Sequence, residues 1–235
     1  MYYKHKEDGW NMRVVLRIGG SVVASPVNTE LISKYAELLK TLKTQGHEVA
    51  VVVGGGTLAR EFISIAKNLE LDEQAQDEIA ISVSRVFAQL LLKKLGNLSC
   101  NAVPLTVDAA AECLNKGKIV IMGGLKPGMT TDSVAALIAE RISADLLVKG
   151  TNQDGVYDKD PKKHRDAVKI DHLSFDDLAS VFSESKHKAG IHQIIDPEAV
   201  KILKRQQVRL IVVNGFAPKN ILAAVAGESV GTVIS

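Results

Sequence analysis

The residues best suited to chemistry are three consecutive glycines at positions 54–56 and Arg60, which follows them one helical turn later. A glycine backbone can come close to a ligand because it has no Cβ atoms, and the N–H groups at a helix start carry a partial positive charge. Both features suit a phosphate group, to which the Arg60 guanidinium would add a fork of donors. The alternative interpretation is an ordinary turn between strand and helix, although such a turn rarely needs three glycines.

Two further short apolar runs also end in glycine. Gly19-Gly20-Ser21 closes the first, and Gly123-Gly124 closes another further along the chain. In an open α/β sheet, ligands bind beyond the carboxyl ends of the strands. Several glycine edges on one side therefore predict an extended polyanionic ligand, or two ligands placed end to end. A Walker A sequence is absent, so the pattern is not that of a P-loop enzyme.

A competing interpretation comes from Gly54, Gly56 and Ala59, which fit the G-x-G-x-x-A pattern of dinucleotide-binding proteins. That pattern requires an acidic residue at the end of a second strand about 20 positions later. Glu73 and Asp77 instead lie in helical sequence. A dinucleotide-binding oxidoreductase or a nucleotide sensor remains an alternative, which tight NADH binding without phosphoryl transfer would favour.

The elements that must position these residues alternate between strand and helix. Short runs rich in β-branched residues predict strands, and apolar residues at helical spacing fill the intervals, the longest such stretch spanning residues 72–95. The predicted strands occupy residues 13–18, 49–53, 102–103, 118–122, 145–149, 210–213 and 232–234. The alternation predicts an α/β fold, a three-layer α-β-α sandwich around a mainly parallel sheet.

Composition limits the partners of this 235-residue chain. Its formal net charge of +2 gives no electrostatic footprint for nucleic acid. No apolar stretch reaches the roughly 18 residues of a membrane-spanning helix, so no membrane partner is expected. The only two cysteines, Cys100 and Cys113, are too few for a disulfide framework or a zinc site, which makes a reduced, cytoplasmic compartment the default expectation.

The first eleven residues are polar and aromatic without a usable period, and Met12 stands directly before the first predicted strand. We therefore expect Met12 to be the natural start and residues 1–11 to be a non-native or disordered extension. The remaining chain, residues 12–235, is expected to form one domain.

Four motifs in order resemble the amino acid kinase family. They are G-G-S after the first strand, V-V-G-G-G-x-x-x-R, P-G-M-T-T-D, and A-D-x-L-x-x-x-T-N-x-D-G-V-Y-x-x-D-P. Within that family the chain is similar to the archaeal type of uridylate (UMP) kinase, from Met12 to its end. The resemblance implies an acceptor (UMP) side in residues 12–143 and an ATP side in residues 144–235.

The resemblance also implies a reaction, the transfer of the γ-phosphoryl group of ATP to UMP in pyrimidine nucleotide biosynthesis, and assigns site residues. The expected catalytic residues are Arg17, Asp145 and Arg60. The expected ATP-binding residues are Gly20, Ser21, Gly56, Arg60, Thr151, Asn152, Tyr157 and Asp160. The expected UMP-binding residues are Gly55, Asp77, Leu125, Lys126, Pro127, Gly128, Met129, Thr130 and Thr131.

One position departs from the family pattern. The family usually carries Lys two residues before the first glycine pair, and here Arg17 stands there. Arg17 keeps the positive charge but not the compact ammonium group, so Lys149 is a second, weaker candidate for the same role. Asp145 matches the carboxylate that orients the basic groups in the family.

A UMP phosphate, with a second pKa of about 6, is already a dianion near neutral pH, so no general base is expected. Mg²⁺ is expected to arrive with ATP rather than in a protein metal site. The family likeness further implies a homohexamer built from dimers.

The closest alternative acceptor is isopentenyl phosphate. Kinases for that substrate resemble this layout but usually place a His soon after the glycine triplet, where this chain has Thr57, Leu58, Ala59 and Arg60. Amino-acid acceptors, used by other family members, are disfavoured by Asp77 and the T-T-D loop.

Overall fold

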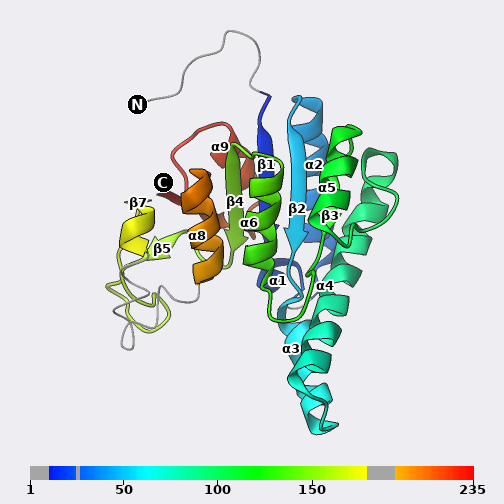
Figure 1. The fold of residues 1–235 in the computed structure, drawn as a ribbon. Coiled ribbons are helices and arrows are strands. Elements are labelled where there is room, and N and C mark those ends of the chain that lie inside the picture. Colours follow the sequence, from blue (N-terminus) through cyan, green and yellow to red (C-terminus); the bar gives the residue numbers. More distant parts are fainter. Residues whose placement is uncertain (1–10, 25–26, 179–193) are drawn as a thin grey trace.

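The structure, a computed structural model, describes residues 11–24, 27–178 and 194–235 (Figure 1). Residues 1–10 lie outside this part, so the expectation that the natural chain starts at Met12 stays a prediction. The described chain enters the first strand almost at once, at Arg13.

In the described residues, seven strands form one sheet. The strands are β1 (Arg13–Ile18), β2 (Glu48–Val53), β3 (Val120–Met122), β4 (Leu146–Thr151), β7 (His172–Leu173), β8 (Arg209–Asn214) and β9 (Thr232–Ile234). Their order is β3-β2-β1-β4-β8-β9-β7, and only the β8–β9 pair is antiparallel. The mainly parallel sheet is confirmed.

A separate two-stranded sheet pairs β5 (Val156–Tyr157) with β6 (Lys169–Ile170). The short strand predicted at residues 102–103 is wrong, because those residues form an irregular connection. Only an isolated bridge between Ser99 and Ile119 extends the pairing in that region.

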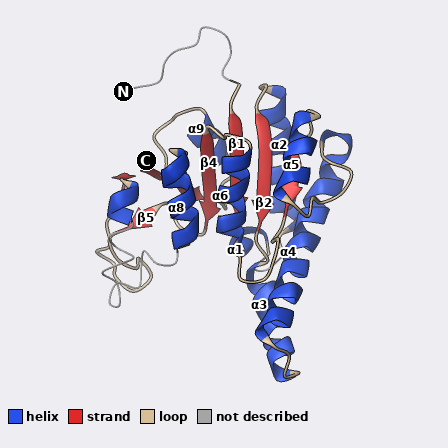
Figure 2. Ribbon diagram, in the orientation of Figure 1, coloured by secondary structure: helices blue, strands red, loops and turns tan. Residues whose placement is uncertain are grey.

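Helices cover both faces of the main sheet (Figure 2). They are α1 (Gly20–Val23), α2 (Thr29–Thr44), α3 (Gly56–Asn68), α4 (Glu73–Leu95), α5 (Val107–Asn115), α6 (Thr131–Arg141), α8 (Pro197–Gln206) and α9 (Lys219–Val225), with a 3₁₀ turn, η1 (Gly96–Leu98). Helices α5 and α6 pack on one face, with α8 against α6, while α2, α4 and α9 pack on the other. The three-layer sandwich is therefore confirmed.

Local sequence explains where the covering helices begin and what they bury. Asn28 caps α2 by accepting a hydrogen bond from Leu31 N at 2.8 Å, and Asp72 caps α4 in the same way. Helix α2 then buries Leu31, Tyr35 and further residues at helical spacing. The Tyr35 hydroxyl donates to Gly215 O at 2.8 Å and so ties α2 to the end of β8.

Helices α3 and α4 pack side by side and project beyond the edge of the sheet at which β1 and β2 end (Figure 1). The sequence predicts one apolar side for α4, but only part of it is buried. Val83, Phe87 and Leu91 are buried, whereas Val86 and Leu90 are 54% and 48% exposed. No helix in the described ranges is both long enough and apolar enough to span a membrane.

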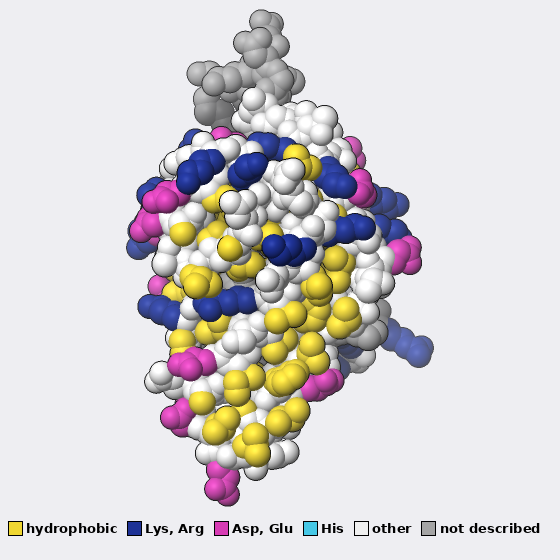
Figure 3. Space-filling model, turned by 90° about the vertical axis from the view of Figure 1, so that its right-hand side faces the viewer, with side chains coloured by type: hydrophobic (Ala, Val, Ile, Leu, Met, Phe, Trp, Pro, Cys, Tyr) yellow, Lys and Arg dark blue, Asp and Glu magenta, His cyan; other side chains and the backbone are white. Residues whose placement is uncertain are grey.

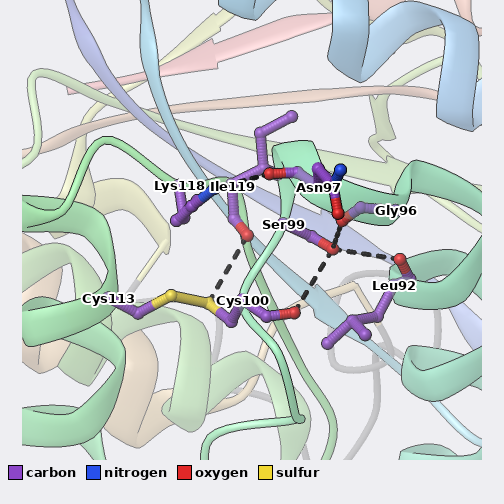
Figure 4. The surroundings of a disulfide bond; sticks show 8 residues. All are labelled: Leu92, Gly96, Asn97, Ser99, Cys100, Cys113, Lys118 and Ile119. Atoms are coloured by element: carbon purple, nitrogen blue, oxygen red, sulfur yellow. Dashed lines mark hydrogen bonds between the residues drawn. A yellow bond between two sulfur atoms is a disulfide. The ribbon is translucent and has the colours of Figure 1, made fainter.

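The two cysteines form a disulfide that the sequence analysis did not predict (Figure 4). It joins Cys100, which follows η1, to Cys113 on α5, with their Cα atoms 6.1 Å apart. Next to it, Ser99 Oγ donates to Leu92 O at 3.0 Å. The bridge thus fastens α5 to the segment that leaves α4.

Candidate active site

The glycine turns after β1 and β2 meet at one edge of the sheet. Strand β1 lies between β2 and β4 in parallel, so the carboxyl ends of all three strands share this edge. The turns touch: a Cβ atom on Gly20 would lie 2.0 Å from Gly56 N, and Gly56 has a positive φ of 62°. Glycine is required at position 20 because a side chain there would force the turns apart, and it is favoured at position 56 because of the left-handed backbone.

Arg17 and Lys149 are register partners on β1 and β4, so their side chains point to the same face of the sheet. That face is covered by α6, whose second residue is Asp132. Asp132 bridges the two cations: its Oδ1 lies 2.7 Å from Arg17 Nε, and its Oδ2 lies 2.5 Å from Lys149 Nζ. Arg17 also donates to the hydroxyl of Thr131 at 2.9 Å.

The Arg17–Asp132–Lys149 cluster is largely withdrawn from water, with side-chain exposures of 17%, 11% and 5%. Burial lowers the pKa of Lys149 to about 8, since the loss of hydration outweighs the attraction of Asp132 and the Arg17 charge adds to the lowering. Burial alone would raise the pKa of Asp132, but the charges of Arg17 and Lys149 outweigh it and lower that pKa. The cluster therefore holds two cations against one ionised carboxylate.

The expectation that Asp145 is the carboxylate that orients the basic groups is wrong. Asp145 lies at the opposite end of the strands, where its Oδ2 accepts from Arg13 N at 2.7 Å. Arg13 and Arg17 are four residues apart on β1, about 13 Å at the rise of a strand. Asp145 therefore cannot contact Arg17 or Lys149, and Asp132 occupies the bridging position instead.

A pocket of about 410 Å³ opens beside the cluster, between α4 and the start of α6. It gathers most of the residues expected to bind UMP: Gly55, Asp77, Lys126, Gly128, Met129, Thr130 and Thr131. Leu125 and Pro127 belong to the same loop but are not among the residues that line it. Residues distant in sequence thus converge on one cavity of the size that small ligands occupy.

Side chains of helix α4 hold the loop of that pocket by hydrogen bonds to the main chain of the loop. Arg85 donates to Gly124 O at 3.0 Å and to Leu125 O at 2.9 Å. Asp77 accepts from Gly128 N at 2.7 Å. The sequence analysis assigned no role to Arg85, because hydrogen bonds to main-chain carbonyls leave no pattern in side-chain types.

Three further residues expected to contact phosphate groups, Gly20, Ser21 and Arg60, lie near the carboxyl edge of the sheet. Gly20 and Ser21 begin α1, directly after β1. Arg60 is exposed on α3, and its guanidinium donates to Thr57 Oγ1 at 3.0 Å, near the start of that helix. No described contact joins Arg60 to the cluster, so its catalytic role stays a prediction.

The candidates for ATP binding continue from the end of β4. Thr151 ends β4, and its carbonyl accepts from Gly215 N at 2.7 Å, while Asn152 is exposed beyond it. Tyr157 lies on β5, and Asp160 accepts from Lys162 N at 3.0 Å in the turn that follows. Their contact with a nucleotide stays a prediction.

The described residues contain no group of three or more His, Cys, Asp or Glu side chains that would hold a metal ion. The most central carboxylate, Asp132, is engaged by two cations. The described residues therefore offer no set of side chains that would enclose Mg²⁺ by themselves.

Comparisons with known proteins point to one family. The model of the amino acid kinase family matches residues 12–214. A uridylate kinase of Methanocaldococcus jannaschii is 46% identical over 95% of this chain and 99% of its own length, and one of Methanobrevibacter smithii is 39% identical over 95% and 99%. The crystal structure of uridylate kinase from Archaeoglobus fulgidus superposes with a TM-score of 0.85 at 41% identity, covering 95% of this chain and all of that one.

Proposed function

The chain belongs to the amino acid kinase family, and from that premise we propose that it is a uridylate (UMP) kinase. In this proposal it is a nucleoside monophosphate kinase, a phosphotransferase that moves the γ-phosphoryl group of ATP to UMP and releases UDP and ADP for pyrimidine nucleotide synthesis. The observation that carries the proposal is the buried Arg17–Asp132–Lys149 cluster next to a pocket lined by the expected UMP residues.

The chemistry follows from charge. A phosphate oxygen of the UMP dianion attacks the γ-phosphorus of ATP, the bond from that phosphorus to the β–γ bridging oxygen breaks, and the electron pair leaves with ADP. No proton has to be removed from the nucleophile, because the second pKa of a phosphate monoester is about 6. The difficulty is the mutual repulsion of two polyanions, which fixed positive charge at the point of transfer offsets.

Arg17 and Lys149 supply that charge in our proposal. Asp132 holds both side chains in place and leaves the cluster with one excess positive charge while Lys149 is protonated. The start of α6, where Thr130 and Thr131 line the pocket, adds the partial positive charge of a helix N-terminus. Arg60 remains proposed as a further contact to the transferred group.

The two substrates are proposed to occupy two halves of one domain. UMP binds on the side formed by residues 12–143, with Asp77 on the ribose. ATP binds on the side formed by residues 144–235, near Thr151, Asn152, Tyr157 and Asp160. Mg²⁺ is proposed to enter with ATP, since it is commonly held by substrate phosphates and water rather than by an all-protein cage. When bound, Mg²⁺ would screen the charge of the phosphate groups.

We also propose that the protein assembles with itself. Six large apolar side chains are exposed along α3, the turn after it and α4: Phe62, Ile65, Leu69, Leu71, Val86 and Leu90. We call this surface the α3–α4 stripe; hydrophobic side chains gather in the lower half of the view in Figure 3. The stripe is uncharged and lies along two packed helices, so an identical stripe in antiparallel orientation would cover it. A dimer formed in this way would be the unit of a hexamer.

A cytoplasmic location stays a prediction.

The proposed function is tested by coupled ADP release with Mg²⁺–ATP and, in parallel, UMP, CMP, dUMP and isopentenyl phosphate. We expect UMP to give the highest kcat/KM. Equal or greater turnover of another acceptor would make the acceptor assignment wrong. Tight NADH binding without ADP release would favour a dinucleotide-binding protein instead.

A further inference from the structure

Helices α6 and α8 begin close together, and Asp196 lies where their first turns meet. The two helices pack against each other. Asp196 is the N-cap residue of α8, and its Oδ1 accepts from Glu198 N at 2.8 Å. One carboxylate oxygen is thus used for an ordinary helix cap.

The second oxygen reaches across to α6. Asp196 Oδ2 accepts hydrogen bonds from the hydroxyl groups of both Thr130 and Ser133. Thr130 is itself the N-cap of α6, since its Oγ1 accepts from Ser133 N at 3.1 Å, and it lines the acceptor pocket. The Thr130 hydroxyl therefore donates one hydrogen bond and accepts another within the protein, and these two bonds fix its side chain at the pocket wall.

The main chain of Asp196 also lies next to the cluster. Its N–H group faces the Asp132 carboxylate and helps to lower the pKa of Asp132. The negative charge of its side chain acts in the opposite sense on Lys149, whose pKa it raises. The groups whose charges act on Lys149 are thus Arg17 from β1, Asp132 from α6 and Asp196 at the start of α8.

We propose that Asp196 is a positioning residue for phosphoryl transfer, which fixes the start of α6, and with it Thr130 and Asp132, against the start of α8. The inference rests on the proposed function and deepens it, because it joins the acceptor pocket to the half of the chain proposed to bind ATP. Asp196 acts through Thr130, Ser133 and Asp132, and touches neither substrate.

The competing explanation is that Asp196 only caps α8. Asparagine caps a helix about as well as aspartate, so Asp196→Asn would then be silent. If Asp196 positions α6, the same substitution has a cost. An amide has one oxygen, which cannot accept from Glu198 N on one side and from two hydroxyl groups on the other.

The experiment compares Asp196→Asn and Ser133→Ala with a matched control, Glu140→Gln. Glu140 accepts from Arg205 at 2.6 Å and from Gln206 at 2.7 Å, so the control alters another polar α6–α8 contact, near the opposite ends of the two helices. For each protein, kcat and KM for UMP and for ATP are measured across pH, together with the thermal unfolding midpoint.

We expect Asp196→Asn to lower kcat on the order of 10- to 100-fold, as small displacements of reacting groups do. In the wild type we expect kcat/KM to fall at alkaline pH as Lys149 loses its proton, and we call this fall the alkaline limb. In Asp196→Asn the limb should move to lower pH, because an anion facing Lys149 is lost. Ser133→Ala should lower kcat by a smaller factor with the limb unmoved, since no charge changes. Glu140→Gln should leave both quantities as in the wild type.

Wild-type kcat and an unmoved limb in Asp196→Asn would overturn the proposal and leave Asp196 as a helix cap. An equal loss of kcat in Glu140→Gln would also overturn it, because general α6–α8 packing would then explain the effect. If Asp196→Asn were too unstable to assay, Ser133→Ala would decide, and an unchanged kcat there would contradict the proposal. Absence of UMP turnover in the wild type would instead contradict the proposed function, and this inference with it.

Discussion

At the scale of single residues, the site concentrates positive charge where the protein has little water to stabilise it. Arg17 and Lys149 lie side by side on β1 and β4, and burial of two cations is costly unless a partner is present. Asp132 compensates one of them. The Asp196 carboxylate acts on Lys149 less than Asp132 does. The positive charge that remains favours a polyanion at this place, and the low hydration strengthens that attraction.

Replacing Arg17 by alanine should lower kcat by more than about 100-fold, because a well-placed arginine in phosphoryl transfer is worth roughly 10³ to 10⁵ in rate. Steady-state kinetics and thermal unfolding on the same samples measure activity and folding. Arg13→Ala is the matched control on the same strand, since Arg13 pairs with Glu48 at 2.6 Å at the exposed opposite end. Near-normal turnover in Arg17→Ala would remove Arg17 from the mechanism.

The rate should depend on the protonation of Lys149. With its pKa lowered to about 8, Lys149 is charged below that pH and loses its charge as the pH rises through it, so kcat/KM should fall on the alkaline side. The corresponding fall of kcat should occur at higher pH than that of kcat/KM, because bound polyanions favour the charged form of Lys149. Lys149→Arg should remove the limb from the profile, as arginine stays protonated. An identical limb in that variant would exclude Lys149 as its origin.

Residue types at strand ends were readable from the sequence, and long-range pairing was not. Arg17 and the glycine turns stand directly beside apolar runs, so their place at the carboxyl edge followed from strand direction. Asp145 precedes a strand, and the assignment based on resemblance overlooked that its side chain must then lie at the amino end. Asp132 appears in the sequence only as the last residue of the P-G-M-T-T-D motif, and nothing local indicates that it reaches two strands.

At the scale of elements, the strands and helices largely follow the sequence periodicity, and the errors occur where tertiary contacts decide. Residues 102–103 are apolar enough for a strand but have no neighbouring strand to pair with. The α4 pattern reads as one apolar side, yet Val86 and Leu90 remain exposed while Phe87 and Leu91 beside them are buried, and no described residue covers the two exposed side chains. Two cysteines thirteen residues apart carry no signal that distinguishes a bridge from two thiols.

The disulfide should stabilise the attachment of α5. Closing a loop of this length is worth about 3 kcal/mol in the chain-entropy account. The double substitution Cys100→Ser with Cys113→Ser should therefore lower Tm by roughly 5 to 10 °C. Calorimetry with and without a thiol reductant measures this: reductant should lower the wild-type Tm and leave the variant unchanged. A wild type indifferent to reductant, with no free thiols after denaturation, would contradict the assigned contribution.

At the scale of the whole molecule, two surfaces have different tasks. The carboxyl edge of the sheet carries the cluster and the pocket, and the α3–α4 stripe extends beyond that edge. The Gly55–Gly56 turn that touches Gly20 also begins α3, so contacts made by α3 reach the carboxyl edge of the sheet directly. Self-association through the stripe would accordingly hold the glycine turn in place.

Ile65→Lys should break the proposed dimer and so lower the mass of the particle in solution, because a lysine in the middle of the stripe would be buried without a partner. Light scattering after size-exclusion chromatography gives the mass. Val168→Lys is the control, since Val168 is 64% exposed and lies away from the stripe, next to β6. A monomeric wild type, or an Ile65→Lys variant of unchanged mass, would contradict the proposed interface.

The central claim is that phosphoryl transfer takes place at the cluster held by Asp132. The most direct test is the single-turnover rate of UDP formation, by rapid quench with saturating UMP and Mg²⁺–ATP, in the wild type, Asp132→Asn and Asp145→Asn. The account predicts a loss of more than about 100-fold for Asp132→Asn, because both cations lose their anchor, and a rate within about threefold of the wild type for Asp145→Asn. A near-normal rate in Asp132→Asn, or an equal loss in Asp145→Asn, would contradict it.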